Sequence, residues 1–242
     1  MADHTRLSGK RILVTGGTTG IGRETIRLLT QQGARVLTFG RDPAALAVAL
    51  DYAQGAQGLT ADAATREGIE AVFRAVDERL GGIDILVACA ALGAQPIHEM
   101  AEDEWRYVVD TNLTGYLSCA RAAIVRMIPQ GGGHLVFVGS ISVEIKKPGE
   151  SVYAATKAGI QAFAETLRKE VAEQNIKVSV VQPGSVATDM QDCTDEEKRA
   201  AVAGDEMLDA VEIAEAIEFV LTRSSRADVV NLRIEPRLQK TS

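Results

Sequence analysis

Tyr153 and Lys157 are the pair of residues in this sequence whose types and spacing suit acid–base chemistry. Residues four apart lie on one face of a helix, so the Lys157 ammonium can approach the Tyr153 phenol. A unit charge at about 4 Å in an effective dielectric of about 20 contributes about 4 kcal/mol, or up to about three pKa units. Such a shift would bring the pKa of the phenol from about 10 toward neutral, where acid and base catalysis are both efficient. The alternative is a solvated lysine beside a half-buried tyrosine, and the rest of the chain must decide between the two.

A glycine-rich turn near the start of the chain is suited to binding a phosphate. Residues 11–15 form a short apolar run, the sequence GGTTGIG follows at 16–22, and a helical pattern covers 24–32. A strand, a glycine turn and a helix in this order direct backbone N–H groups and a helix N-terminus at a phosphate. The glycines stand at 16, 20 and 22 rather than in the commoner G-x-G-x-x-G spacing, so a merely tight turn is the alternative.

The end of the second predicted strand bears on which nucleotide would bind. This strand covers 35–39 and is followed by Gly40, Arg41, Asp42 and Pro43. Asp42 is a predicted N-cap, and Pro43 suits the first position of the next helix. An arginine at this place accommodates the 2′-phosphate of NADP, whereas an acidic residue holds the ribose hydroxyls of NAD. We therefore predict that Arg41 binds the phosphate; the alternative is a solvated arginine, with Asp42 as the ribose ligand.

The third strand, predicted over 58–62, ends in another carboxylate. Asp62 could receive the amino group of an adenine or serve as a turn or cap residue, and the sequence leaves both roles open. Thr65 begins an amphipathic helix that is predicted to reach Leu80. The fourth strand, 83–88, is a continuous apolar run, as expected of a strand buried on both faces of a parallel sheet.

The middle of the chain carries further candidates for chemistry. A helical region predicted from 102 to 127 contains Asn112, a poor helix former that either bonds its local backbone or has a polar task in the interior. The fifth strand, 134–138, begins with His134, which we interpret as structural, and is followed by Ser140. A long helix over 151–173 then carries Tyr153 and Lys157.

The remaining elements complete a single domain. A sixth strand over 177–182 closes with Pro183 and Gly184, and a final strand covers 228–234. Between them, the spacing of Asp209 and Glu212 predicts a capping box for a helix that reaches Thr222. The unusual residues follow the carboxyl ends of strands, where open parallel sheets bind ligands. No repeat, low-complexity segment or linker divides the chain, so we expect one domain over 1–242.

The overall composition excludes several classes of protein. The 242 residues are 46% hydrophobic with a mean hydropathy near zero, which suits one large α/β domain. The net charge of −7, without Lys/Arg clusters among aromatic residues, argues against a nucleic-acid partner. Three widely spaced cysteines and three histidines predict no metal site and a reduced, cytoplasmic protein. The chain begins without a leader-type apolar region, and no apolar run approaches the roughly 20 residues that span a bilayer, so we expect no membrane association.

With these residues in view, nearly the whole sequence resembles the short-chain dehydrogenase/reductase family, in its compact, single-domain branch. The family's T-G-x-x-x-G-x-G cofactor loop corresponds to Thr15, Gly16, Gly20 and Gly22. Its P-G-x-x-x-T element corresponds to Pro183, Gly184 and Thr188. Its Asn-Ser-Tyr-Lys tetrad corresponds to Asn112, Ser140, Tyr153 and Lys157. One such match arises readily by chance, but an ordered set does not.

The resemblance implies a doubly wound, Rossmann-like three-layer α/β sandwich with a mostly parallel seven-stranded sheet in the order 3-2-1-4-5-6-7. It also implies NAD(P)-dependent interconversion of a carbonyl and a secondary alcohol in a small-molecule substrate, with NADP(H) preferred and NAD(H) left open. Tyr153 would be the acid and base, Ser140 would bond to the reacting oxygen, Lys157 would also hold the nicotinamide ribose, and Asn112 would position a water in a proton relay. The predicted cofactor-binding residues are Thr15, Gly16, Thr18, Thr19, Gly20, Ile21, Gly22, Arg41, Asp62, Ala90, Tyr153, Lys157, Pro183, Gly184, Val186 and Thr188.

Two segments depart from the family pattern. The run Ala88-Cys89-Ala90-Ala91 replaces Asn-Asn-Ala-Gly after the fourth strand, which removes an amide that usually ties the central sheet and adds methyl groups near the cofactor. At the C-terminus, residues 232–237 replace a glycine-rich ending that is common in the branch. The resemblance implies a homotetramer or homodimer in which helices at 113–128 and 151–173 pair across a two-fold axis.

Two other functions fit the same fold. A catalytically silent nucleotide-sensing or scaffold protein would have less need of the tetrad, and epimerases or dehydratases of nucleotide sugars usually carry a longer C-terminal substrate domain. Residues 185–208 are the predicted substrate loop. Its acid-rich part, 189–207, has a weak helical pattern over 195–203 and is expected to form a lid that is mobile in the free enzyme. The alternative is a permanently packed surface helix.

Overall fold

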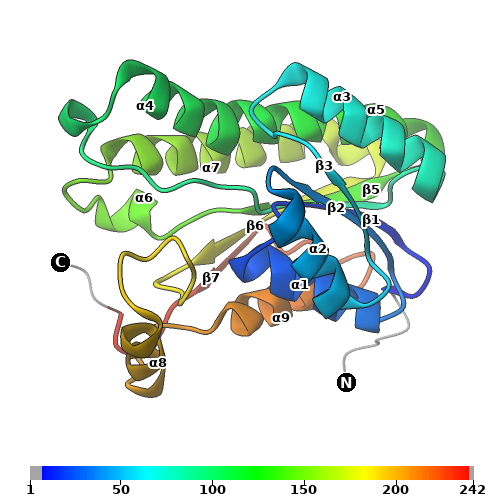
Figure 1. The fold of residues 1–242 in the computed structure, drawn as a ribbon. Helices are drawn as coiled ribbons and strands as arrows, with labels where there is room; N and C mark the ends of the chain where they lie inside the picture. Colours follow the sequence, from blue (N-terminus) through cyan, green and yellow to red (C-terminus); the bar gives the residue numbers. More distant parts are fainter. Residues whose placement is uncertain (1–6, 240–242) are drawn as a thin grey trace.

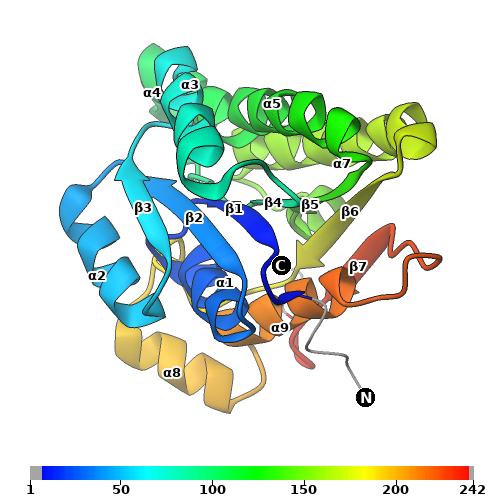
Figure 2. The ribbon, with the colours of Figure 1, turned by 90° about the vertical axis from the view of Figure 1, so that its right-hand side faces the viewer.

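Seven strands form one sheet in the order β3-β2-β1-β4-β5-β6-β7, as the sequence predicted (Figure 2). The computed structural model describes residues 7–239; residues 1–6, on which the expected lack of a leader partly rests, and residues 240–242 lie outside this range. The sheet is wholly parallel rather than mostly parallel. The strands are β1 (Arg11–Thr15), β2 (Arg35–Gly40), β3 (Gln57–Thr60), β4 (Ile85–Ala88), β5 (Gly133–Val138), β6 (Ile176–Pro183) and β7 (Asn231–Ile234).

Helices cover both faces of the sheet and complete the predicted three-layer sandwich (Figure 1). One face carries α1 (Gly20–Gln31), α2 (Pro43–Ala53) and α9 (Ala210–Leu221). The other face carries α3 (Arg66–Ala75), α4 (Glu102–Val109), α5 (Gly115–Gln130) and α7 (Ser151–Val171). The short α6 (Ser142–Ile145) and α8 (Asp195–Ala203) lie outside these layers, and α8 stands apart from the sheet in both views (Figures 1 and 2).

Each face of the sheet buries its own hydrophobic cluster, which accounts for the apolar runs in the strands. Phe137 and Leu86 point toward α5 and α7, where Tyr116 and Ile160 meet them. Val14, on the opposite face, belongs to the cluster that α1 and α9 complete. Strands buried on both faces in this way read as continuous apolar sequence rather than as an alternation.

Local signals set several helix starts correctly. The Asp42 carboxylate accepts the N–H groups at the start of α2, and the Thr65 hydroxyl accepts from the first turn of α3. Asp209 and Glu212 form the predicted capping box of α9. These side chains satisfy N–H groups that have no partner within the helix, and the pattern is readable because it spans only three residues.

Other boundaries differ from the prediction. Helix α1 begins at Gly20 rather than at residue 24, so the last glycines of the turn belong to its first turn. Strand β3 ends at Thr60, which leaves Asp62 in the following turn, where its Oδ1 accepts the N–H of Ala64 (2.9 Å). Strands β4 and β7 begin later than predicted, at residues 85 and 231. Helix α5 continues to residue 130, because Gly131 in the left-handed conformation (φ 89°) ends it.

A wide, π-helical turn at Asp110–Thr114 joins α4 to α5. Such turns insert one residue into the helical repeat and occur frequently at functional sites. The turn carries Thr111 and Asn112 into the interior, where Asn112 is fully buried. The sequence anticipated a helix here but not the change in its geometry.

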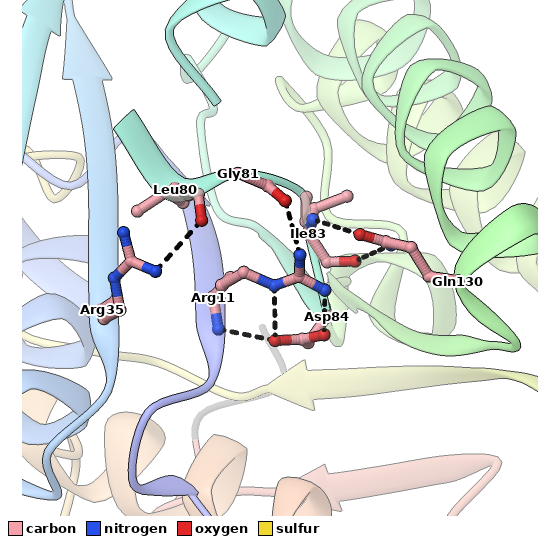
Figure 3. Close-up of polar contacts among 7 residues, drawn as sticks. All are labelled: Arg11, Arg35, Leu80, Gly81, Ile83, Asp84 and Gln130. Atoms are coloured by element: carbon pink, nitrogen blue, oxygen red, sulfur yellow. Dashed lines mark hydrogen bonds and ion pairs between the residues drawn. The ribbon is translucent and has the colours of Figure 1, made fainter. Parts of the chain in front are cut away.

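Polar contacts around Arg11 and Asp84 hold the sheet together at the amino ends of its strands (Figure 3). The Asp84 carboxylate accepts bonds from the backbone N–H, Nε and Nη2 of Arg11 at 2.7–3.0 Å. Arg11 Nη1 also donates to the Gly81 carbonyl (2.7 Å), and the Gln130 amide pairs with the backbone of Ile83. These contacts join β1 and β4 to the end of α5, on the edge opposite the predicted site.

His134 lies at the same edge, at the beginning of β5. Its Nε2 is 2.8 Å from the Ser179 hydroxyl, and burial, aided by the charge of Lys177, lowers its pKa to about 4. A neutral, hydrogen-bonded histidine away from the carboxyl ends agrees with its interpretation as structural. Among residues 7–239, no helix is both long and apolar enough to cross a membrane.

We expect Asp84→Asn to lower the free energy of unfolding by about 1–2 kcal/mol at neutral pH, since a partly buried, charge-assisted cluster loses its anion. Burial raises the pKa of Asp84, but the side-chain and backbone bonds from Arg11 lower it further, so the net pKa lies below its ordinary value. The carboxylate is therefore fully stabilising above about pH 4, and its contribution is lost as pH falls through the lowered pKa. Urea unfolding of the two proteins at several pH values measures the difference.

Asp51→Asn is a suitable control, because Asp51 is exposed on α2. The difference between wild type and Asp84→Asn should narrow below about pH 4, while Asp51→Asn should match the wild type throughout. An Asp84→Asn protein as stable as the wild type at pH 7 would contradict this account of the edge.

Candidate active site

Two adjoining cavities lie beyond the carboxyl ends of the strands. The larger, about 640 Å³, extends from the glycine turn to Arg41 and Asp62. The smaller, about 370 Å³, is lined by Ser140, Tyr153 and Lys157. They share the lining residues Ile21, Cys89, Ala91, Gly93, Thr188 and Met190. The parallel register brings these segments together, because it aligns the strand ends that precede them.

Most of the predicted site residues line one cavity or the other. On the larger cavity are Gly16, Thr18, Thr19, Gly20, Ile21, Gly22, Arg41, Asp62, Ala90 and Thr188. On the smaller cavity are Ser140, Tyr153, Lys157, Pro183, Gly184 and Val186. Thr15 and Asn112 lie behind the walls rather than on them.

The glycine turn is built so that backbone forms the floor of the larger cavity. A Cβ on Gly16 would lie 2.6 Å from the Ala90 Cα, and one on Gly22 would lie 2.1 Å from the Gly16 carbonyl oxygen. Gly16 also has φ of 69°, a region that side chains disfavour. Thr19, the N-cap of α1, makes no side-chain bond to its helix. The first residues of α1 line the cavity and have no side-chain cap, so their N–H groups, with the helix dipole, could bind an anion there.

Thr15 supports this turn from below. Its hydroxyl, only 2% exposed, accepts the N–H groups of Cys89 (3.1 Å) and Ala90 (3.0 Å). The run that lacks the family's asparagines is thus tied to β1 by a threonine hydroxyl. Thr15 shapes the cavity without reaching it.

Asn112 fixes the loop that follows β4. Its Oδ1 accepts the Leu92 N–H and its Nδ2 donates to the Leu92 carbonyl, both at 2.8 Å, with a longer contact to Thr156 (3.4 Å). Of the two roles that the sequence left open, the structure shows the polar task in the interior. The bonds cross twenty residues of chain, from the π-helical turn to the cavity wall.

Lys157 is buried, with 1% of its surface exposed. Its Nζ donates to the Val138 carbonyl (2.8 Å) and to the Tyr116 hydroxyl (3.3 Å), and lies 5.7 Å from the centroid of the Tyr153 ring. Burial lowers the pKa of Lys157 to about 8, while Cys89 acts in the opposite direction. The helical spacing does bring the two side chains together, but Lys157 lies against the ring and is held by other groups.

The expected acidification of Tyr153 is wrong for the protein on its own. Burial raises the pKa of Tyr153 to about 12; the hydrogen bond from Ser140 lowers it, and the negative charge of Glu150 raises it. Spacing alone indicated that a cation lies close by, but it gave no measure of desolvation, which is the larger effect. Tyr153 therefore holds its proton at neutral pH.

Three features of the site were not predicted. Ser140 and Ser142 exchange hydrogen bonds at 3.1 Å, and Ser142 Oγ donates to Glu150 (3.0 Å), which places a carboxylate in the smaller cavity. Thr111 lines the larger cavity, and its buried Oγ1 has no hydrogen-bond partner among residues 7–239. Tyr107, one helical turn before Thr111, bonds to both Arg41 and Asp62. Tyr107 and Thr111 are four residues apart and therefore share one helix face, shortly before Asn112. This spacing is the one sequence signal that could have indicated them.

Comparisons with known proteins agree with this geometry. Residues 10–199 match the family model described as short chain dehydrogenase. The chain is 33% identical to 3-oxoacyl-[acyl-carrier-protein] reductase FabG of Vibrio cholerae over 220 residues, which cover 88% of this chain and 90% of that protein. It is 31% identical to an uncharacterized oxidoreductase of Staphylococcus epidermidis, over 96% of this chain and 99% of the relative. It is 35% identical to glycine betaine reductase ATRR of Emericella nidulans over 96% of this chain but 19% of that protein.

The fold and site thus define an oxidoreductase that works with a dinucleotide. The chain belongs to the short-chain dehydrogenase/reductase family and is an NAD(P)-dependent enzyme that acts on CH–OH and C=O groups.

The residues of the larger cavity fit such a cofactor. The bare backbone of Gly16 and Gly22 allows the close approach of a pyrophosphate, and the N-terminus of α1 faces it. The buried Oγ1 of Thr111, which has no partner in the part of the chain that the structure describes, offers a hydrogen bond from the wall of this cavity, whose end at Asp62 would hold the adenosine half. Arg41 adds a positive charge at that end.

We expect Gly22→Ala to weaken NADPH binding by at least about tenfold and to destabilise the protein by about 1–3 kcal/mol. The new methyl group would lie 2.1 Å from a backbone carbonyl, which cannot move without opening the turn. Gly93→Ala is the matched control on the same wall, because its Cβ would meet only Met190 Cγ at an ordinary 3.5 Å. Fluorescence titration with NADPH, alongside urea unfolding, measures both effects. Equal NADPH affinity in the two variants would show that the turn tolerates a side chain.

Proposed function

We propose that this chain reduces a small carbonyl compound to a secondary alcohol, and catalyses the reverse reaction, with Tyr153 as the acid and base and NADPH as the preferred cofactor. The observation that carries the proposal is the convergence of Ser140, Tyr153 and Lys157 on a 370 Å³ cavity that adjoins the glycine-turn cavity. A silent sensor or scaffold would have no need of a protonated phenol, a serine and a buried lysine on one wall.

The nicotinamide, when bound, supplies the hydride for reduction or accepts it in oxidation. Tyr153 Oη donates its proton to the oxygen of the reacting carbonyl, and its pKa of about 12 keeps that proton in place until the oxygen becomes basic. The Ser140 hydroxyl orients the same oxygen by hydrogen bonding. Lys157, already beneath the Tyr153 ring, stabilises the tyrosinate that forms.

The substrate is best sought among small ketones, aldehydes and 3-oxoacyl thioesters, the last because of the reaction named for the FabG relatives. The spectrophotometric rate of NADPH consumption over such a panel tests the proposal directly. Turnover of at least one carbonyl supports it. Tight NADPH binding without any consumption across the panel would favour the silent sensor.

Tyr153→Phe should lower kcat by at least about 100-fold while leaving the Kd for NADPH within a few fold, since only the proton donor is removed. The ring, Lys157 and the cofactor cavity remain. Initial-rate assays with the best substrate of the panel measure kcat, and fluorescence titration of the same preparation measures the Kd for NADPH. A variant that retains most of its kcat would remove Tyr153 from the mechanism.

The preference for NADPH is supported by the two residues that follow β2. Arg41 lines the cavity, directly after Gly40, and no acidic side chain precedes it there. The Asp42 carboxylate is engaged as the cap of α2, with bonds to Ala44 N (2.8 Å) and Ala45 N (3.3 Å). This engagement favours Arg41 over the alternative in which Asp42 holds the ribose.

Arg41→Asp should therefore reverse the cofactor preference. One charge-assisted contact contributes about 1.5–3 kcal/mol, or about 10- to 150-fold in kcat/KM, and an aspartate would also repel the 2′-phosphate. The ratio of kcat/KM for NADPH and NADH is compared in wild type and variant. The assignment fails if the wild-type enzyme uses both cofactors equally.

We also propose that residues 189–207 act as a lid over the substrate cavity. No side chain of α8 is buried, so the helix adds nothing to the hydrophobic core. The segment is tied down after this helix: Leu208 N donates to the Ser185 carbonyl (2.9 Å), and Arg237 forms an ion pair with Asp205. Gln239 also bonds to both the backbone and the hydroxyl of Ser185. A segment whose helix buries no side chain, and whose ties to the rest of the fold lie mainly at its C-terminal end, can open at low free-energy cost.

Hydrogen exchange across residues 189–203 should show fast exchange in the free enzyme and slower exchange with saturating NADPH and substrate, because Thr188, at the root of the lid, lines both cavities. The amides of β5 and β6 serve as an internal reference that should not change. Strong and equal protection of α8 in both states would favour the permanently packed helix.

A further inference from the structure

The end of the larger cavity holds a hydrogen-bonded chain of three side chains from three different elements. Arg41 follows β2, Asp62 follows β3, and Tyr107 belongs to α4, in the layer on the other side of the cavity. Arg41 Nη1 donates to the Tyr107 hydroxyl at 2.7 Å, and that hydroxyl donates to Asp62 Oδ2 at 2.6 Å. The Tyr107 hydroxyl thus lies between a cation and an anion and bonds to both.

The arrangement leaves Arg41 well placed for an anion. A guanidinium carries five N–H donors, and only one of them has a partner within residues 7–239, namely Tyr107. The Arg41 Cζ also lies 5.3 Å from the centroid of the Tyr107 ring, within the range of a cation–π contact. Tyr107 therefore holds the Arg41 guanidinium at one nitrogen and packs against one of its faces. The other N–H donors of Arg41 stay available to a ligand.

The same hydroxyl prevents an unfavourable alternative. Arg41 and Asp62 carry opposite charges and follow neighbouring strands of the sheet, so direct pairing between them would neutralise the cation. Asp62 is instead satisfied at both oxygens, with Oδ1 accepting the Ala64 N–H and Oδ2 accepting the Tyr107 O–H. Burial, and then the bond to Asp62, raise the pKa of Tyr107 despite the opposing effect of Arg41, so the hydroxyl stays a neutral donor.

From this geometry we infer that Tyr107 is a positioning residue for cofactor selectivity: its hydroxyl holds Arg41 toward the 2′-phosphate of NADP(H) and keeps it from pairing with Asp62. The inference rests on the proposed preference for NADPH. It concerns the adenosine half of the cofactor and makes no demand on the chemistry at Tyr153.

The test uses ligand binding, without any substrate. Calorimetric or fluorescence-displacement titrations give the Kd of 2′,5′-ADP, which carries the 2′-phosphate, and of 5′-AMP, which lacks it. Tyr107→Phe keeps the ring and removes the hydroxyl, so the Kd for 2′,5′-ADP should rise about five- to tenfold while that for 5′-AMP changes less than about twofold. Retained 5′-AMP binding also shows that the variant is folded.

Two further variants separate positioning from a general structural role. Tyr52→Phe is the matched control: the Tyr52 hydroxyl also bonds to a carboxylate, Glu24 (3.2 Å), and its ring also lies beside arginines, but on α2, away from both cavities. It should leave the ratio of the two Kd values unchanged. The double variant Tyr107→Phe with Asp62→Asn removes the competing anion and should restore part of the lost 2′,5′-ADP selectivity.

The outcomes test the role of Tyr107 separately from the proposed preference for NADPH. A wild-type preference for 2′,5′-ADP that persists in Tyr107→Phe, or a loss of affinity equal for both ligands, would overturn the role of Tyr107 and leave the NADPH preference standing. Equal affinities of the wild type for the two ligands would overturn the NADPH preference itself, and the role of Tyr107 with it. Absence of any rescue in the double variant would contradict competition by Asp62.

Discussion

The buried ammonium of Lys157 is the constraint on which the candidate active site depends. A lysine that is 1% exposed requires polar partners inside the protein, because an unpaired buried charge is strongly destabilising. The structure supplies them as the Val138 carbonyl, at the end of β5, and the Tyr116 hydroxyl, on α5. These partners fix α7 against β5 and α5, and the same contacts place Tyr153 and Ser140 beside one cavity. The position of the candidate site residues and the burial of the charge therefore have one structural origin.

The amino ends of the strands carry contacts that stabilise the fold, whereas the carboxyl ends carry the candidate site. At the amino ends, Arg11 and Asp84 satisfy each other directly and join neighbouring elements. At the carboxyl ends, some polar groups lack partners: within the described range the Thr111 hydroxyl has none, and the N-terminus of α1 has no side-chain cap. Unsatisfied groups of this kind are unfavourable in a folded chain and are retained where a ligand can satisfy them. The contrast locates the site independently of any motif.

Features that depend on residues close together in the sequence could be predicted, whereas contacts between residues far apart in the sequence could not. The caps at Asp42 and Thr65 and the order of the strands were predictable, because the caps are local patterns and the order follows the family resemblance. The partner of Asn112 was not, since Leu92 lies twenty residues away and is contacted through its backbone, which leaves no trace in residue type. The pKa of Tyr153 was predicted in the wrong direction because spacing indicates proximity to Lys157, whereas desolvation depends on the assembled core. The Tyr107 bridge escaped notice for a related reason: three elements meet there, and none of them alone is unusual.

The chain's last described residues reach the smaller cavity rather than forming an appendage to the sheet. Gln239 lines the smaller cavity and bonds to Ser185, while residues 235 and 236 lie against Gly184. Residues 235 and 236 belong to the stretch, 232–237, that departs from the family's usual glycine-rich ending, and Gln239 follows it. The segment helps to line the smaller cavity, whereas Ser140 follows β5 and Tyr153 and Lys157 belong to α7, so its sequence can change without replacing those side chains. Divergence at the end of the chain is thus a route by which enzymes built on this scaffold can acquire new substrates while their reaction stays the same.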